Sequence, residues 1–191
     1  MNSETILSLF LGIGLAASVG FRVFLPLFAL SLAAYFNVWE LNENWQWIGS
    51  TTALITLGVA TVVEIFGYFI PWVDNLLDTL AIPLAAIAGT AVMVSTVANL
   101  DPVVTWSLAI IAGGGTATAI KGAGATGRLA SSTSTGGLAN PVISTVETGT
   151  AVAVSTASIF APILAAVLVI IILIIIFRIY RKLRPRSKPS L

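Results

Sequence analysis

The sequence predicts an all-α membrane protein with about six transmembrane helices. Of its 191 residues, 57% are hydrophobic and only 9% are charged, whereas a soluble domain carries about 25% charged residues. This composition excludes an ordinary soluble enzyme, a nucleic-acid-binding protein and a disordered chain. Histidine and cysteine are both absent from the sequence. We therefore expect no metal site, no cofactor and no enzymatic activity, since no nucleophile–base pair is evident.

Six segments are apolar enough to cross the ~30 Å hydrocarbon layer, which takes about 20 residues of helix. The expected spans are 6–36, 50–70, 79–98, 103–120, 138–157 and 159–177. The first is too long for one straight crossing, so we expect a broken first helix with Gly20 and Pro26 as its break points. The last contains a run of β-branched residues, which in lipid is expected to be helical because a helix satisfies its own backbone.

The basic residues predict the orientation in the membrane, because they gather on the cytoplasmic side. Six of the 9 basic residues lie at positions 178–191. We therefore expect the C-terminal tail, 179–191, to be cytoplasmic and to anchor the topology in the inner membrane. Six crossings place the N-terminus on the cytoplasmic side as well. The connectors 37–47 and 99–102 then lie outside, and the connector with Lys121 and Arg128 lies inside.

Three short matches suggest an internal repeat. They occur in the same order in the two parts of the chain and pair Gly12–Ala16 with Gly113–Ala117, Thr61–Glu64 with Ser144–Glu147, and Ile82–Ala86 with Ala161–Ala166. Three spans per half would give the two halves opposite orientations, as in many transporters. We therefore expect inverted three-helix halves at 1–100 and 101–178. The alternative is unrelated helices enriched in small residues that allow close packing.

Ionisable residues inside the apolar segments are the first candidates for a functional site. Arg22, Glu64 and Glu147 lie well within expected spans, and a central arginine costs at least ~2.5 kcal/mol to insert. Lys121 lies in the repeat region that corresponds to Arg22. These residues could form proton or cation sites, or counter-charges along a path. Equally, they could form buried ion pairs that only fix helix register.

Asp74 and Asp78 are a second pair of candidates. They are four residues apart and would share one face of a helix. They could coordinate a cation at the inner mouth of the protein. We favour the alternative, in which they are solvated connector residues or helix caps.

The stretch 112–137 is rich in glycine and also holds Lys121 and Arg128. Glycine lets a backbone leave helical geometry and expose its amides to a ligand. The glycines that could line such a site are Gly113, Gly114, Gly115, Gly122 and Gly124. With the two basic residues, exposed amides would favour an anionic solute. The alternative is a flexible cytoplasmic loop joined to a close helix contact. The G-x-G-x-x-G pattern at 122–127 lacks a βαβ context and predicts no nucleotide site.

Three segments resemble a known family. Gly20–Leu27 (GFRVFLPL), Lys121–Arg128 (KGAGATGR) and Ser134–Glu147 (STGGLANPVISTVE) are similar to signatures of small bacterial multi-pass integral membrane proteins grouped as a domain of unknown function. In that family a histidine often precedes the lysine and an acidic residue follows the glutamate, whereas Ile120 and Thr148 stand here. The resemblance implies a multi-pass membrane protein and supplies no substrate.

These observations together predict a small transporter or channel with a polar site at mid-membrane, used by a small ion or an anionic solute. The candidate residues are Arg22, Glu64, Asp74, Asp78, Lys121, Arg128 and Glu147. One alternative is a non-transporting scaffold or assembly protein. Another is a lipid-handling enzyme that uses Asp74, Asp78 or Glu147. Small membrane proteins often self-associate, so a homo-oligomer is also an expectation.

Overall fold

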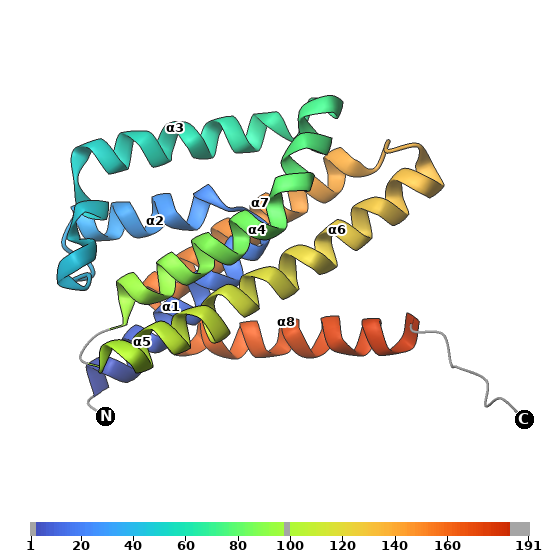
Figure 1. The fold of residues 1–191 in the computed structure, drawn as a ribbon. Coiled ribbons are helices and arrows are strands. Elements are labelled where there is room, and N and C mark those ends of the chain that lie inside the picture. The colour runs from blue at the N-terminus through green and yellow to red at the C-terminus, as the bar shows by residue number, and fades with distance from the viewer. Residues whose placement is uncertain (1–2, 98–99, 184–191) are drawn as a thin grey trace, which may run out of the picture.

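A computed structural model describes residues 3–97 and 100–183, and every regular element among them is helical. In chain order these are α1 (Ser3–Phe21), α2 (Phe24–Tyr35), the 3₁₀ helix η1 (Glu43–Gly49), α3 (Thr51–Gly67), α4 (Pro71–Thr96), α5 (Pro102–Leu108), the π-helical η2 (Ala109–Gly114), α6 (Gly115–Thr135), α7 (Asn140–Phe160) and α8 (Pro162–Leu183). The all-α prediction is confirmed. Figure 1 shows the long helices side by side in one bundle.

Five described helices are long and apolar enough to cross a membrane, and η1 with α3, bent by 63°, could form a sixth span. The prediction of a multi-pass membrane protein is therefore confirmed. The fourth span is longer than expected, because α5, η2 and α6 continue as one apolar stretch over Pro102–Thr135. The glycine-rich region is thus helical as far as Thr135. It ends at Gly136 and Gly137, whose φ values of 62° and 86° belong to the left-handed region that glycine favours at helix ends.

The first apolar stretch folds back on itself (Figure 1). The break lies at Arg22 and Val23, between the two predicted break points. α2 has 12 residues, which at 1.5 Å per residue is about 18 Å, too short to cross the bilayer. α2 returns toward the end of the bundle where α1 began. Beyond α2, the Trp39 indole donates a hydrogen bond to the Ile159 carbonyl at 2.9 Å.

This fold-back changes the expected topology, in which both chain ends lie on one side. α1 and α8 run parallel: a Cβ on Gly14 would lie 3.1 Å from Ala165 near the start of α8, and Phe21 at the end of α1 lines the same pocket as Ile176 further along α8. Ser3 and Leu183 consequently lie at opposite ends of the bundle (Figure 1). The physical reason is that a segment that folds back adds no net crossing. Residues 184–191 of the expected basic tail lie outside the described residues.

The structure differs from the expected inverted repeat in one of the three matched pairs. The first matched pair lies in α1 and at the junction of η2 and α6. These helices run parallel (Figure 1), and a Cβ on Gly20 would lie 2.5 Å from Ile120. α3 and α7, and also α4 and α8, run in opposite directions (Figure 1). Two of the three matched pairs are therefore inverted and the first is not. The difference again follows from the fold-back of the first stretch.

Glycine packing holds the centre of the bundle together. A Cβ on Gly113 would lie 2.5 Å from the Gly89 carbonyl oxygen, and one on Gly89 would lie 2.8 Å from the Gly113 carbonyl oxygen. Gly114 lies equally close to α4, at Ala86 and Thr90. Small residues of this kind let two helix backbones touch. Gly113 and Gly114 therefore serve a helix contact.

Candidate functional site

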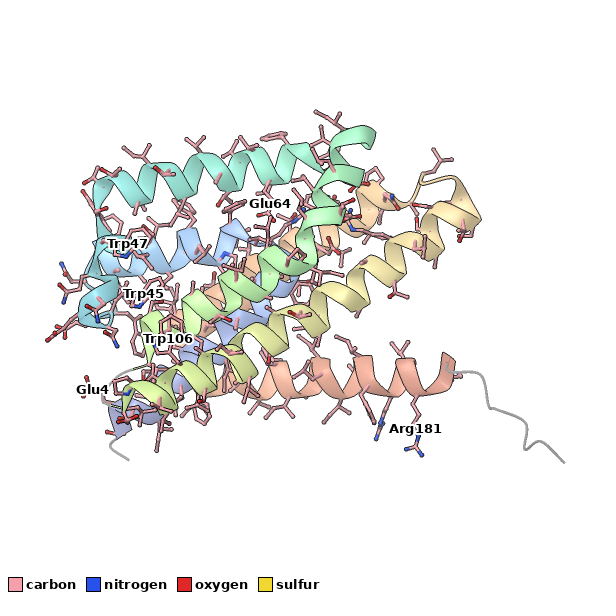
Figure 2. The ribbon with its side chains drawn as sticks, in the orientation of Figure 1. Glu4, Trp45, Trp47, Glu64, Trp106 and Arg181 are labelled. Atoms are coloured by element: carbon pink, nitrogen blue, oxygen red, sulfur yellow. The ribbon has the colours of Figure 1, made fainter. Side chains whose placement is uncertain are left out.

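The ionisable residues of the apolar segments gather at one place, around the break between α1 and α2. Figure 2 shows Glu64 between α3 and α2 at this point. We call the group the charge cluster; it consists of Arg22, Glu64, Asp74, Asp78, Lys121, Arg128 and Glu147. Six of these residues are buried, and Asp78 keeps 26% of its side chain exposed. The structure thus brings together all seven residues selected from the sequence.

Two members of the cluster cap the ends of the broken helix. The Lys121 ammonium donates to the Phe21 carbonyl, at the end of α1, at 3.0 Å. The Glu64 carboxylate accepts from the backbone amides of Val23 at 2.7 Å and Phe24 at 2.9 Å, at the start of α2. Helix ends carry unpaired polar groups and partial charge, and a positive group suits the C-terminus and a negative one the N-terminus. These contacts satisfy the backbone groups of two buried helix ends, which lipid tails could not satisfy.

Arg22 is held by neutral oxygens of α7. Its Nε donates to Thr148 Oγ1 at 2.9 Å, and its Nη2 donates to the Ser144 carbonyl at 2.8 Å and to the Ser144 hydroxyl. The side chain is fully buried, and within the described residues its Nη1 has no hydrogen-bond partner. Arg22 therefore joins the α1–α2 break to α7 without neutralising a carboxylate directly.

Arg128 is the centre of the ion pairs. Its Nη1 lies 2.7 Å from Asp74 Oδ1, its Nη2 pairs closely with Glu147 Oε2, and its Nε lies 4.0 Å from Asp78 Oδ1. We favoured Asp74 and Asp78 as solvated connector residues or helix caps, and for Asp74 that was wrong. Asp74 is only 5% exposed and is paired with Arg128. The reason is that α4 begins at Pro71, so both aspartates lie on the helix face that meets α6.

Tyr68, in the connector after α3, was not selected from the sequence. The guanidinium carbons of Arg22 and Arg128 lie 4.2 and 4.4 Å from its ring centroid. An aromatic face attracts cations at this range. Burial, followed by the charges of Asp78 and Glu64, raises the pKa of the Tyr68 phenol above its ordinary value. Tyr68 is therefore a neutral contact between two cations.

Sequence patterns gave no direct indication of Tyr68, which carries no charge at neutral pH. Ser144 and Thr148 could have been found, because with Glu147 they follow the spacing of one helix face. Asn140 was also missed; its amide donates to Asp74 Oδ2 at 3.4 Å. That contact crosses from α7 to α4 and depends on tertiary structure alone.

The cluster contains three basic and four acidic side chains. With all seven ionised it carries a formal charge of −1, and three of its carboxylates surround the single guanidinium of Arg128. The anionic solute was expected from exposed glycine amides, but Gly122 and Gly124 lie within the regular helix α6. Lys121 and Arg128 are occupied by Phe21 and by the carboxylates. The glycine amides and the two basic side chains are therefore not arranged as the sequence-based expectation of an anion site requires.

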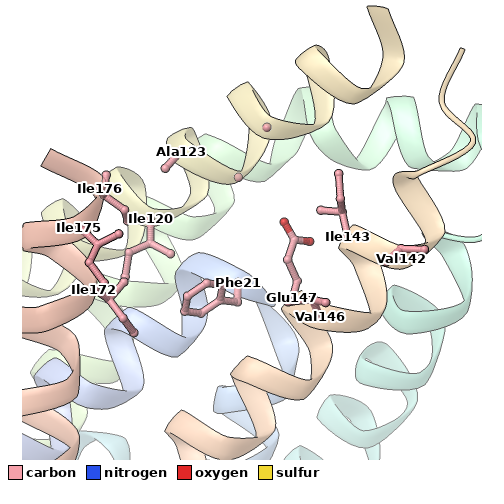
Figure 3. Close-up of a pocket in the computed structure, with 12 residues that line it drawn as sticks. Phe21, Ile120, Ala123, Val142, Ile143, Val146, Glu147, Ile172, Ile175 and Ile176 are labelled. Atoms are coloured by element: carbon pink, nitrogen blue, oxygen red, sulfur yellow. The ribbon is translucent and has the colours of Figure 1, made fainter. Parts of the chain in front are cut away.

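A cavity of about 440 Å³ lies between α6, α7 and α8 and reaches Glu147 (Figure 3). We call it the Glu147 cavity; its lining consists of Phe21, Ile120, Ala123, Gly124, Gly127, Val142, Ile143, Val146, Glu147, Ile172, Ile175 and Ile176. Glu147 is the one ionisable side chain among these described lining residues. A second cavity, of about 880 Å³, lies between α6 and α8 and shares Ala123, Gly127 and Ile176 with the first.

No arrangement of three or more acidic side chains suited to a metal ion occurs in residues 3–97 and 100–183. The profile of a domain of unknown function, DUF4126, matches residues 9–182. The chain belongs to the DUF4126 family. The resemblance seen in the sequence is thereby confirmed, and the match includes all seven residues of the charge cluster. No curated protein and no solved structure matches the chain.

Proposed function

We propose that the protein passes a small solute or ion across the membrane at the charge cluster. The observation that carries this proposal is the broken helix α1–α2, whose two ends meet buried charges on α3 and α6. Discontinuous helices of this kind form the binding sites of many transporters. Ionisable residues in membrane interiors commonly mark ion or solute paths.

The charge of the cluster favours a cation or a proton over an anion. Its formal charge is −1 when every member is ionised, and its ion pairs place three carboxylates on one arginine. A bound cation or proton would compensate this charge, whereas an anion would add to it. This choice replaces the anionic solute suggested by the glycine-rich sequence.

The proposed orientation follows the basic residues. Arg181 lies at one end of the bundle, and Glu4, Trp45 and Trp47 lie at the other (Figure 2). We place the Arg181 end in the cytoplasm, because basic residues concentrate there. The N-terminus then lies outside a bacterial inner membrane, opposite to the C-terminal tail.

The scaffold remains the main rival function, and one observation favours it. Lys121 and Glu64 are both occupied by helix ends, as expected of charges that only hold the fold. A scaffold, however, predicts a bundle with no cavity at the charges, and here a pocket that opens on the apolar outer surface of the bundle reaches Glu147. The lipid-handling enzyme would need a metal group or a nucleophile–base pair beside Asp74, Asp78 or Glu147, and the described residues hold no group of three or more acidic side chains suited to a metal ion. We therefore propose no enzymatic activity.

Flux into liposomes tests the proposal. Purified protein is reconstituted with a pH-sensitive dye inside the vesicles, and flux is recorded under proton, Na⁺ and K⁺ gradients. We expect flux above that of empty vesicles, which Glu147→Gln and Arg22→Ala abolish. Glu40→Gln is the matched control, because Glu40 is an exposed carboxylate outside the cluster.

Circular dichroism and gel filtration must show that the variants remain folded. Unchanged flux in both Glu147→Gln and Arg22→Ala would remove the cluster from the transport path. Wild-type flux equal to that of empty vesicles for every ion would favour the scaffold.

A further inference from the structure

We infer that the solute is a lipophilic organic cation, which enters the Glu147 cavity sideways from the bilayer. This inference rests on the proposed function and names its class of substrate. It combines three observations: the exposed apolar rim of the cavity, its unfilled glycine wall and the charge at its inner end.

The rim of the cavity lies on the apolar outer surface of the bundle. Val142 is 65% exposed, Val146 63% and Ile175 50%, and all three line the cavity. In a membrane, such a surface faces lipid tails. A molecule with an apolar body can therefore reach the cavity from the hydrocarbon layer without passing through water.

The α6 wall of the cavity includes two glycines, Gly124 and Gly127, beside Ile120 and Ala123. A Cβ on Gly127 would meet no atom within 4 Å, and a Cβ on Gly124 would meet only Glu147 Oε1, at 2.9 Å. In this chain glycines that serve helix packing are different, as Gly113 against Gly89 shows. The space in front of Gly127 is available to a ligand.

The inner end of the cavity carries a carboxylate that can accept a further bond. Glu147 Oε2 is paired with Arg128 Nη2, whereas Glu147 Oε1 has only a 3.5 Å contact with Arg128 Nε. The Glu147 carboxylate stands among apolar side chains of α1, α6 and α8 (Figure 3). A cation beside Oε1 would bring the formal charge of the cluster from −1 to zero. A buried charge is tolerated when it is paired in this way.

The apolar lining decides between an inorganic and an organic cation. A small metal ion would lose its hydration, and the described lining offers only Glu147 as a charged replacement. Burying such an ion without ligands to replace its water molecules costs much free energy. An organic cation spreads its charge and places its apolar groups against isoleucine and valine, which is favourable. The site therefore fits an ammonium or phosphonium ion with a bulky apolar body.

Binding of tetraphenylphosphonium to the purified protein tests the inference. Isothermal titration calorimetry in nanodiscs measures the binding of tetraphenylphosphonium and, separately, of tetraphenylborate, an ion of the same shape and opposite charge. We expect saturable binding of the cation and none of the anion. Glu147→Gln should weaken the affinity for the cation about tenfold or more, because a tenfold loss corresponds to about 1.4 kcal/mol and one charge contact is removed.

Two glycine variants separate the cavity from general effects on the protein. Gly127→Leu fills the cavity and should abolish cation binding. Gly149→Leu is its matched control: a Cβ there also meets nothing within 4 Å, but Gly149 is not among the described residues that line the cavity. It should bind like wild type. If Glu147→Gln does not fold, Gly127→Leu carries the test.

Equal binding of the two ions, or wild-type affinity in Gly127→Leu, would overturn the inference. The result is distinguishable from the flux experiment, because calorimetry measures binding without transport. Binding of tetraphenylphosphonium with no flux of any ion would leave the cation site standing and remove the transport function. Glu147-dependent flux of small ions without binding of tetraphenylphosphonium would support the transport function and overturn the inferred class of substrate.

Discussion

The glycines of one continuous helical stretch are packed in opposite ways at its two ends. Near the start, in η2, Gly113 touches the backbone of α4, and a Cβ would come within 2.5 Å of the Gly89 carbonyl oxygen. Further along, in α6, Gly122 and Gly127 have nothing within 4 Å of a Cβ. The first glycine lets two helices meet, and the second leaves a wall of a cavity empty. The same residue type therefore marks a packed core in one region and an unoccupied site in the other.

The charged residues of the cluster also form two groups, one that caps helix ends and one that forms ion pairs. Lys121 and Glu64 lie toward the packed region and cap the ends of the broken helix. Arg128 forms ion pairs with Asp74 and with Glu147, and Glu147 also lines the cavity. We therefore expect the first pair to affect mainly stability, and Glu147 to affect mainly function. The following variants test this division, from the largest expected effect to the smallest.

The largest loss of stability is expected for Arg128→Met. Removing the guanidinium leaves Asp74, Asp78 and Glu147 without their shared counter-charge, and breaking a buried ion pair from one side costs about 3–5 kcal/mol. Thermal unfolding in detergent, followed by fluorescence of the 5 tryptophans, measures the change. Arg178→Met, at an exposed arginine of α8, is the control. Equal midpoints for the two variants would contradict the assignment of Arg128 as the centre of the cluster.

A matched glycine pair tests the packing comparison itself. Gly113→Leu forces a side chain into the backbone of α4 and should cost on the order of 3 kcal/mol or prevent folding, as overpacking does. Gly127→Leu points into open space and should change stability by about 0.5 kcal/mol at most, as surface changes do. Gel filtration and the unfolding midpoint report both. Similar losses in the two variants would mean that the Glu147 cavity is closed in the folded protein.

A smaller effect is expected for Glu64→Ala. It removes the acceptor for two backbone amides at the start of α2, and an unsatisfied buried donor costs about 1–3 kcal/mol. Glu40→Ala, at an exposed glutamate, should leave the unfolding midpoint unchanged. A Glu64→Ala variant as stable as wild type would show that Glu64 is free to act in transport and does not hold the fold.

The fold class and the members of the cluster could be predicted from the sequence because insertion costs are large and local. Charges such as Arg22 and Glu64 inside apolar segments need partners wherever they lie, and the structure supplies them. The partners themselves could not be predicted. Arg128 meets Asp74, 54 positions away in sequence, because α4 packs along η2 and α6. Tyr68 also joins the charge cluster only through tertiary packing, by its contacts with Arg22 and Arg128. Its uncharged side chain does not stand out in the sequence.

The directions of the helices relative to one another were harder to predict than the fold class. Gly20 and Pro26 indicated a break in 6–36, but a break alone does not distinguish a kinked crossing from a fold-back. The direction of α2 decides it, because this helix of 12 residues runs back toward the start of α1 (Figure 1). The error in the first matched pair of the repeat follows from this one turn. The fold-back reverses all later helices relative to α1 and leaves their directions relative to one another unchanged.

Cysteine labelling in intact cells tests the fold-back at Arg22 most directly, because the sequence contains no native cysteine. Single cysteines at Glu4, Glu43, Ser132 and Lys182 replace exposed residues and are probed with a membrane-impermeant maleimide. The structure predicts that positions 4 and 43 label from one side and positions 132 and 182 only from the other. Labelling of position 4 together with position 132 would mean that 6–36 crosses the membrane once, and would contradict the arrangement that brings the charge cluster together.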